Sequence, residues 1–161
     1  MFRVGSGYDV HALTPGRKLI LGGVQIESPL GLDGHSDADV LVHAVIDALL
    51  GAANLGDIGA LFPDCDPQFK GADSLILLQK TYALLLQKGW RLSNIDSTII
   101  AQKPKLSPFI EKMKDNLAKT LEVPVDLVSI KATTTEKLGF VGKEEGIAAE
   151  AVVLIHPVQD T

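Results

Sequence analysis

The segment from Asp37 to Ala53 constrains the fold more than any other, because it combines helical length with apolar side chains on almost every side. A helix that is apolar all round has to be covered by the rest of the protein. Its richest apolar stretch, Ala44–Ala53, is short and includes Asp47, whereas a membrane-spanning helix needs about 20 apolar residues. We therefore expect a helix inside a globular domain, and no membrane span.

One polar stripe interrupts this helix. Asp39, His43 and Asp47 follow one another at intervals of four residues, so they share one face. Burying polar groups without partners destabilises a fold, so each of these side chains needs a partner. A divalent metal ion is one partner that a buried histidine can have.

Two further candidate ligands lie near the start of the chain. Asp9 and His11 are two residues apart in a predicted strand, so their side chains leave the same face. With His43 they would provide one carboxylate and two imidazoles, leaving a fourth position for water or substrate, as in catalytic zinc sites. Asp39 or Asp47 could then accept an imidazole N–H. On spacing alone, the alternative that His43 is only a hydrogen-bonded core residue stays open.

The composition fits one domain and argues against a nucleic-acid partner. The chain has 161 residues, of which 46% are hydrophobic, so one core of ordinary size is expected. The formal net charge is −5 and the sequence has no run of Lys or Arg, so a polyanion would be repelled. The single cysteine, Cys65, cannot form an internal disulfide, which predicts a reducing compartment. We expect a cytoplasmic protein, or the processed form of an organellar one.

Periodicity and turn residues predict an α+β fold for a single domain over residues 1–161, with a mixed β-sheet and helices packed on one face. The predicted strands are 2–10, 91–101, 127–132 and 147–155, an extended segment or hairpin covers 18–27, and the helices are 37–53, 73–88 and one that begins after Ser107. The run from Ile147 to Ile155 is nearly continuous in apolar residues, so we expect both of its faces to be covered. Another subunit could provide one of these covers.

Two motifs could bind a phosphate. In the turn GHSDAD, Ser36 or Asp37 could cap the predicted helix, while its exposed amides, together with His35 and Ser36, could hydrogen-bond an anion. The segment Thr133–Lys137 places three hydroxyls beside Glu136, which could hold Mg²⁺ against phosphate oxygens. Alternatively, these threonines are present because they favour a strand.

Longer motifs identify a family. They are Gly7–His11, His35–Val40, Asp47–Ala52, Gly56–Gly59, Leu61–Asp64, Lys70–Ser74, Ile99–Gln102 and Lys131–Gly139. In sequence and in order, these segments closely resemble the 2-C-methyl-D-erythritol 2,4-cyclodiphosphate synthase family. The resemblance extends from about residue 2 to residue 155.

The resemblance implies a lyase of the non-mevalonate isoprenoid pathway. Such an enzyme converts 4-diphosphocytidyl-2-C-methyl-D-erythritol 2-phosphate into the cyclic diphosphate and releases CMP. The resemblance also implies a homotrimer with active sites between subunits. It assigns one Zn²⁺ per subunit to Asp9, His11 and His43, and Mg²⁺ or Mn²⁺, bound with the substrate diphosphate, to Glu136.

The same resemblance assigns catalytic and substrate-binding positions. His35 and Thr134 match positions that align the substrate and stabilise the transition state. Residues from Asp57 to Asp66 would surround the methylerythritol, and Ala101–Ser107 would form the cytidine pocket. The full substrate-binding set is Asp9, Val10, His11, His35, Ser36, Asp57, Ile58, Gly59, Phe62, Pro63, Asp64, Cys65, Asp66, Ala101, Gln102, Lys103, Pro104, Lys105, Leu106, Ser107, Thr133, Thr134, Thr135, Glu136, Phe140 and Lys143.

The chain departs from the family pattern at two positions. Ser6 stands where the family often has His, and Lys143 stands where it often has Arg. The resemblance places both near the axial cavity of the trimer, where isoprenoid diphosphates can bind. Lysine keeps the charge but lacks the bidentate fork of arginine, so we expect weaker binding of such ligands.

The implied reaction agrees with the residue types. The 2-phosphate oxygen attacks the β-phosphorus in line, so catalysis needs charge neutralisation and positioning. It needs no general base, because the attacking phosphate is already ionised. Two other functions stay open on the residues alone: a zinc-dependent phosphoesterase in which water attacks, and a non-catalytic trimeric nucleotide-binding module.

Overall fold

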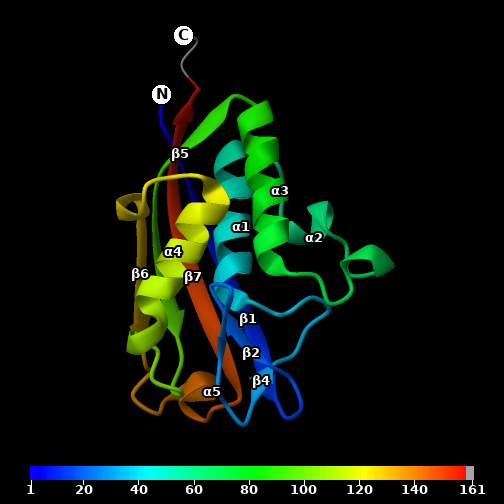
Figure 1. Ribbon diagram of the computed structural model, residues 1–161, viewed down its shortest axis with the longest axis vertical. Coiled ribbons are helices and arrows are strands. Elements are labelled where there is room, and N and C mark those ends of the chain that lie inside the picture. Colours follow the sequence, from blue (N-terminus) through cyan, green and yellow to red (C-terminus); the bar gives the residue numbers. More distant parts are fainter. Residues whose placement is uncertain (159–161) are drawn as a thin grey trace.

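A five-stranded sheet forms the back of the computed structural model, which describes residues 1–158 (Figure 1). Its strand order is β4-β1-β7-β5-β6. The strands are β1 (Arg3–Thr14), β4 (Gly31–Leu32), β5 (Trp90–Ile100), β6 (Val128–Thr133) and β7 (Gly146–Pro157). β5 and β6 are parallel, whereas β7 runs antiparallel to both β1 and β5. The predicted mixed sheet is confirmed, and the strands lie within a few residues of their expected bounds.

Helices cover one face of this sheet, as predicted (Figure 1). The long helices are α1 (Val40–Ala53), α3 (Ser74–Gln87) and α4 (Ile110–Leu121). Shorter elements are the hairpin strands β2 (Leu19–Leu21) and β3 (Val24–Ile26), helices α2 (Ile58–Leu61) and α5 (Gly139–Gly142), and 3₁₀ turns at Pro67–Phe69, Ser107–Phe109 and Val125–Leu127. The short helices and turns were not predicted, because each is too short to show a periodicity.

Helix α1 is the buried helix that its sequence predicts, and β1 passes directly against it. A Cβ atom built on Gly5 would lie 2.0 Å from the carbonyl oxygen of Ala48, and one built on Gly7 would lie 2.0 Å from that of Ala44. Only glycine fits at these two positions, so the backbones of β1 and α1 approach closely. This approach places the side chains that follow Gly7 on β1 next to the first turns of α1.

The start of α1 differs from the prediction. Asp39, rather than Ser36 or Asp37, is the N-cap residue, and its carboxylate accepts a hydrogen bond from the Val42 amide at 3.1 Å. Ala38, just before the cap, has a φ of 57°, so the helix cannot begin earlier. The expected capping by Ser36 or Asp37 is therefore wrong, because the backbone turns sharply between these residues and the helix.

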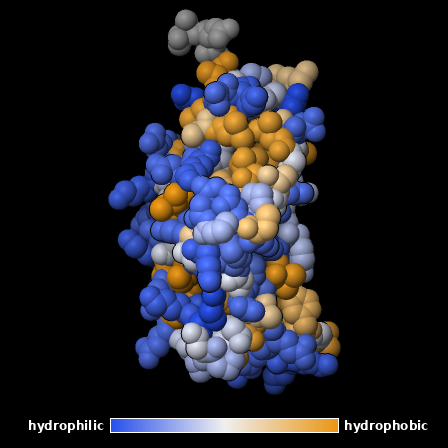
Figure 2. Space-filling view, turned by 90° about the vertical axis from the view of Figure 1, so that its right-hand side faces the viewer, coloured by the Kyte–Doolittle hydropathy of each residue, from blue (hydrophilic) through white to orange (hydrophobic). Residues whose placement is uncertain are grey.

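The sheet face away from the helices is open in the single chain. Val153 and Ile155 of β7 point under the helices and are fully buried, whereas Val152 is 47% exposed on the other face, where Tyr8 and Glu150 are exposed too. The expectation that both faces of β7 are covered thus holds for one face within the chain. Figure 2 shows the side of the molecule that carries α2 and α3, where apolar side chains gather in the upper part. None of the helices described within residues 1–158 has the length and apolar character that a membrane span requires.

Candidate metal and phosphate site

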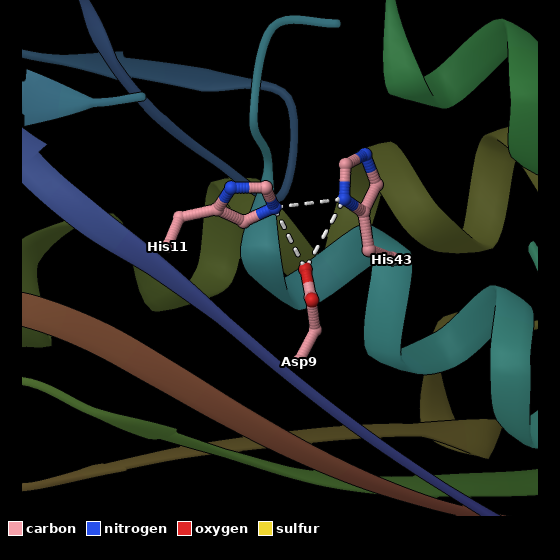
Figure 3. A group of neighbouring side chains, drawn as sticks. All are labelled: Asp9, His11 and His43. Carbon is pink, nitrogen blue, oxygen red and sulfur yellow. Dashed lines mark hydrogen bonds and ion pairs between the residues drawn. The ribbon is translucent and has the colours of Figure 1, made fainter. Parts of the chain in front are cut away.

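Asp9, His11 and His43 converge where β1 passes the first turn of α1 (Figure 3). The Asp9 Oδ2 atom lies 2.9 Å from His11 Nε2 and 3.2 Å from His43 Nδ1, and the two ring nitrogens are 3.2 Å apart. One ligand atom from each residue lies within 4.8 Å of the other two. The structure therefore brings together the three side chains that spacing along the strand and helix selected.

The chemistry of this trio fits a metal ion such as Zn²⁺. One carboxylate oxygen and two imidazole nitrogens are ligands that zinc accepts, and three protein ligands leave a further position open. Burial favours a higher pKa for Asp9, but hydrogen bonds from His11 and His43 outweigh it and lower the pKa to about 2. Burial likewise opposes the charge on His11, yet its hydrogen bond with Asp9 raises the pKa of His11. The cluster thus favours a cation between these groups.

The outer ring nitrogens of both histidines have partners that orient the rings. His11 Nδ1 lies 2.7 Å from the backbone oxygen of Asp33, which can only accept a hydrogen bond. His43 Nε2 lies 2.9 Å from Ser74 Oγ and 3.2 Å from Ser36 Oγ. When these outer nitrogens carry the hydrogen of the neutral rings, His11 Nε2 and His43 Nδ1 keep lone pairs that a metal ion beside Asp9 could accept.

The expectation that Asp39 or Asp47 accepts an imidazole N–H is wrong. Besides capping α1, Asp39 accepts hydrogen bonds from the amides of Gly22 and Gly23 and so anchors the β2–β3 hairpin. Asp47 accepts from the Ile58 amide at 2.8 Å and fixes the start of α2. Both carboxylates are thus used by backbone donors. Ser74 was missed, since it lies 31 residues from His43 on another helix.

A hollow of about 210 Å³ opens beside the trio. Its lining residues are Asp9, His11, Gly34, His35, Ser36, His43, Ile58, Gly59, Phe62, Asp64, Phe69 and Leu77. His35 is held at the rim, because its Nε2 atom lies 3.3 Å from the Asp66 backbone oxygen and its own backbone oxygen accepts from the Gly71 amide at 2.8 Å. The structure thus brings the predicted phosphate motif, the trio and part of 57–66 into one hollow.

Several expected residues do not line this hollow. Val10 is 44% exposed, because alternation along β1 turns its side chain to the opposite face from Asp9 and His11. Asp57 instead caps α2 by accepting from the Ala60 amide at 2.8 Å. Pro63, Cys65 and Asp66, which follow α2 and were also expected at the substrate, are not among the lining residues of the hollow.

A second hollow of about 390 Å³ lies where β5 and β6 end. It is lined by Ala101, Gln102, Lys103, Pro104, Lys105, Leu106, Ser107, Ala132, Thr133 and Thr134. The Gln102 side chain accepts from the Lys137 amide at 3.1 Å, and Lys103 forms an ion pair with Glu144 at 3.0 Å. The first contact joins the expected cytidine segment to the turn after β6, and the second joins it to the segment between α5 and β7.

The turn after β6 places Thr134 and Glu136 together. Thr134 Oγ1 lies 3.3 Å from a Glu136 carboxylate oxygen, and both side chains are close to solvent. Thr135, Phe140 and Lys143 lie further along this turn and α5 and do not line the hollow. Within residues 1–158, the two hollows share no lining residue, so they are separate hollows of the single chain.

This fold and this trio define an α+β protein with a three-residue cluster that could hold a metal ion and would leave a further coordination position open. The chain belongs to the YgbB family, whose sequence profile matches residues 2–156. A 2-C-methyl-D-erythritol 2,4-cyclodiphosphate synthase of Geobacter metallireducens is 63% identical over 154 residues, which are 96% of this chain and 98% of that protein.

Solved structures show the same fold. A complex of Plasmodium falciparum IspF with CDP aligns with a TM-score of 0.87 and 34% identity over 98% of this chain and 97% of that one. The bifunctional IspDF of Campylobacter jejuni aligns with a TM-score of 0.94 and 47% identity over 98% of this chain. This chain spans 42% of the bifunctional protein, so the likeness concerns one part of it.

Proposed function

We propose that this chain, as one domain, is a 2-C-methyl-D-erythritol 2,4-cyclodiphosphate synthase that converts 4-diphosphocytidyl-2-C-methyl-D-erythritol 2-phosphate into the cyclic diphosphate and CMP. The observation that carries the proposal is an intact Asp9–His11–His43 trio beside a hollow, in a chain alignable over nearly its whole length with relatives of that name. The CDP bound to the Plasmodium falciparum structure supports a cytidine nucleotide as part of the substrate.

We infer that Asp9, His11 and His43 hold one Zn²⁺ and that Glu136 contributes to Mg²⁺ or Mn²⁺ binding with the substrate diphosphate. When bound, these ions would supply Lewis-acid polarisation and neutralise phosphate charge. The ligand types support this, because imidazole suits zinc and an exposed carboxylate suits a hard cation.

The residues of the chain position the reacting groups. His35 and Ser36, at the rim of the first hollow, can donate hydrogen bonds to a phosphate, and the Thr134 hydroxyl can do so at the second. The 2-phosphate oxygen forms a bond to the β-phosphorus while the bond to the α-phosphate oxygen breaks, and CMP leaves with the electron pair. Because both partners are anionic, alignment and donor groups carry the catalysis.

A homotrimer with composite sites would bring the two half-sites together. The substrate carries a nucleotide at one end and a phosphorylated tetritol at the other, whereas each hollow of one chain suits only one end. The open face of the sheet, with Val152 and Tyr8 exposed, supports a neighbouring subunit on this side. In such an assembly, the second hollow of one subunit would lie beside the trio of the next.

Product analysis of the purified chain tests this function. With Zn²⁺, Mg²⁺ and the cytidyl substrate, we expect equal amounts of CMP and cyclic diphosphate in phosphorus NMR spectra. An opened hydrolysis product would indicate a phosphoesterase, and nucleotide binding without turnover would indicate a binding module. His43→Ala should lose both zinc and turnover, whereas Lys80→Ala, on α3 outside both hollows, should keep them.

A further inference from the structure

We propose that Ser74 and Asp37 are positioning residues that fix the tautomer and orientation of His43. This inference rests on the proposed zinc site. Ser74 is the first residue of α3, is fully buried, and has its Oγ atom 2.9 Å from His43 Nε2. Asp37 accepts a hydrogen bond from the same Ser74 hydroxyl, and another from the Ser74 amide at 3.0 Å.

The direction of these hydrogen bonds decides which nitrogen of His43 is free. The Asp37 carboxylate has no hydrogen to give, so Ser74 must donate its only hydroxyl hydrogen to Asp37. The Ser74 oxygen can then only accept, and it accepts from His43 Nε2–H. His43 Nδ1 is consequently unprotonated in the neutral ring and points toward Asp9 and His11, where a metal would be bound.

Ser36 is a weaker partner for the same nitrogen. Its Oγ atom lies 3.2 Å from His43 Nε2 and already accepts from the Ala38 amide at 3.2 Å. No carboxylate hydrogen bond to Ser36 is found in the described chain, so its hydroxyl hydrogen is free to turn. Ser74 lies closer than Ser36 to His43 Nε2, and its hydroxyl hydrogen is held by Asp37. Ser74 is therefore the residue that determines the direction of the hydrogen bond with His43 Nε2.

Asp37 and Ser74 also hold the end of the loop that contributes to the lining of the first hollow. The loop from Phe62 to Asp73 joins α2 to α3 and carries Asp64 and Phe69 into the lining. Its end is tied to the phosphate motif, because the Asp37 amide donates to the Ala72 oxygen at 3.1 Å. Asp37 thus helps to fix both the His43 ring, through Ser74, and the end of the loop from Phe62 to Asp73.

Zinc affinity of Ser74→Ala tests the proposal. We expect its zinc dissociation constant, measured by competition with a chromophoric chelator, to rise about 10- to 100-fold. Ser97→Ala is the matched control, because Ser97 is also buried and its hydroxyl bonds the Ser129 oxygen at 3.0 Å, outside both hollows. That variant should bind zinc like the wild type while losing a comparable buried hydrogen bond.

Asp37→Asn is a second variant of nearly identical shape. If the amide oxygen of Asn accepts from the Ser74 amide, its NH₂ group faces the Ser74 hydroxyl and turns the hydroxyl hydrogen toward His43 Nε2. That reversal favours the wrong tautomer, so we expect a loss of zinc affinity at least as large as in Ser74→Ala. In nitrogen-15 NMR spectra of the zinc-loaded wild type, the His43 Nε2–H signal should be protected from solvent exchange, and this protection should fall in both variants.

The outcomes separate this inference from the proposed function. If the wild type binds zinc and both variants bind it equally well, with the Nε2–H protection unchanged, the positioning role is wrong and the zinc site stands. If the wild type itself binds no zinc, the zinc site and the positioning role are both wrong. The proposal is supported if Ser74→Ala and Ser97→Ala lower the free energy of unfolding equally, but only Ser74→Ala lowers the zinc affinity.

Discussion

The Asp9 carboxylate sits between two imidazoles and determines the charge of the whole cluster. Its pKa of about 2 means that it stays ionised, since its hydrogen bonds with both rings outweigh the effect of burial. The His11 pKa is raised by the same contact, again against burial. A proton on His11 and a metal ion at its Nε2 atom are therefore competing ways of placing positive charge beside Asp9.

This competition predicts a pH-dependent zinc affinity. Because the pKa of His11 lies above 6.5 in the metal-free fold, a proton has to leave before Nε2 can bind zinc. We expect the apparent affinity to increase as the pH rises through and above 6.5, and to level off once His11 is neutral. Chelator competition at several pH values measures it, and an affinity that is already constant below pH 6.5 would contradict the competition.

The metal-free chain should show the opposite trend in stability. A folded-state pKa above 6.5 means that protonated His11 stabilises the fold below pH 6.5, and that this contribution is lost as the pH rises through the folded pKa. Urea unfolding in a chelator should accordingly give a lower free energy of unfolding above this range. His11→Asn should flatten the slope, and an unchanged slope in that variant would assign the titration to another group.

Thr134 can be tested apart from substrate affinity. Its hydroxyl lies beside Glu136 in the lining of the second hollow, where the proposed function places the diphosphate. Thr134→Val keeps the shape but removes a donor to developing charge, so we expect kcat to fall by about 10²-fold while the dissociation constant of CMP stays close to the wild-type value. Thr134→Ser, which keeps the hydroxyl, should retain most of the rate. Equal losses in both variants would indicate that the side-chain shape matters, and not the hydroxyl.

At the scale of elements, the packing of β1 against α1 builds the trio. His43 is fixed on the helix and Asp9 and His11 on the strand, so the distance between the two backbones sets the distances between the ligands. Gly7 lies two residues before Asp9 and, like Gly5, stands where the backbones of β1 and α1 approach closely. The geometry of the site therefore depends on Gly7 of β1, where a larger residue would push the strand away from α1.

Gly7→Ala should accordingly destabilise the fold. The new Cβ would lie 2.0 Å from the Ala44 oxygen and 2.8 Å from the Ala48 amide nitrogen, so strand and helix must separate. We expect the free energy of unfolding to fall by about 3 kcal/mol or more, as for strong overpacking, and zinc affinity to fall with it. Gly51→Ala, on α1 with only the Ser6 oxygen nearby at 3.9 Å, should instead raise stability by up to about 1 kcal/mol. Urea unfolding of both variants measures the difference.

The long elements could be predicted from the sequence, and the contacts between them could not. Helix α3 begins after Asp73 and ends before Gly89, as its capping residues indicate. Strand β6 was predictable because apolar and polar residues alternate in its sequence. The Asp9–His11–His43 trio was predictable because strand and helix periodicity orient the ligands. The partners of His43 and Asp39 were not predictable, since Ser74 and the Gly22–Gly23 turn approach only in the folded chain.

At the scale of the whole molecule, one chain leaves two features incomplete. The sheet is covered by helices on one face only, and the two hollows that the proposed function assigns to the two ends of the substrate share no residue within residues 1–158. The proposed homotrimer would complete both, because a subunit packed on the open face would supply the missing half-site. Assembly and turnover should therefore be lost together, whereas the trio, which comes from one chain, should keep its metal.

Val152→Asp tests this link. Val152 is 47% exposed on the open face, and its register partner on β5 is Asp96, which is paired with Lys131, so the new carboxylate would place an unpaired charge where the subunits are proposed to meet. We expect analytical ultracentrifugation to show monomers that still bind one zinc ion per chain but have lost turnover. Ile76→Asp is the matched control, since Ile76 is 51% exposed on α3, on the helical side. A Val152→Asp protein that is monomeric and fully active would show that one chain contains the complete site.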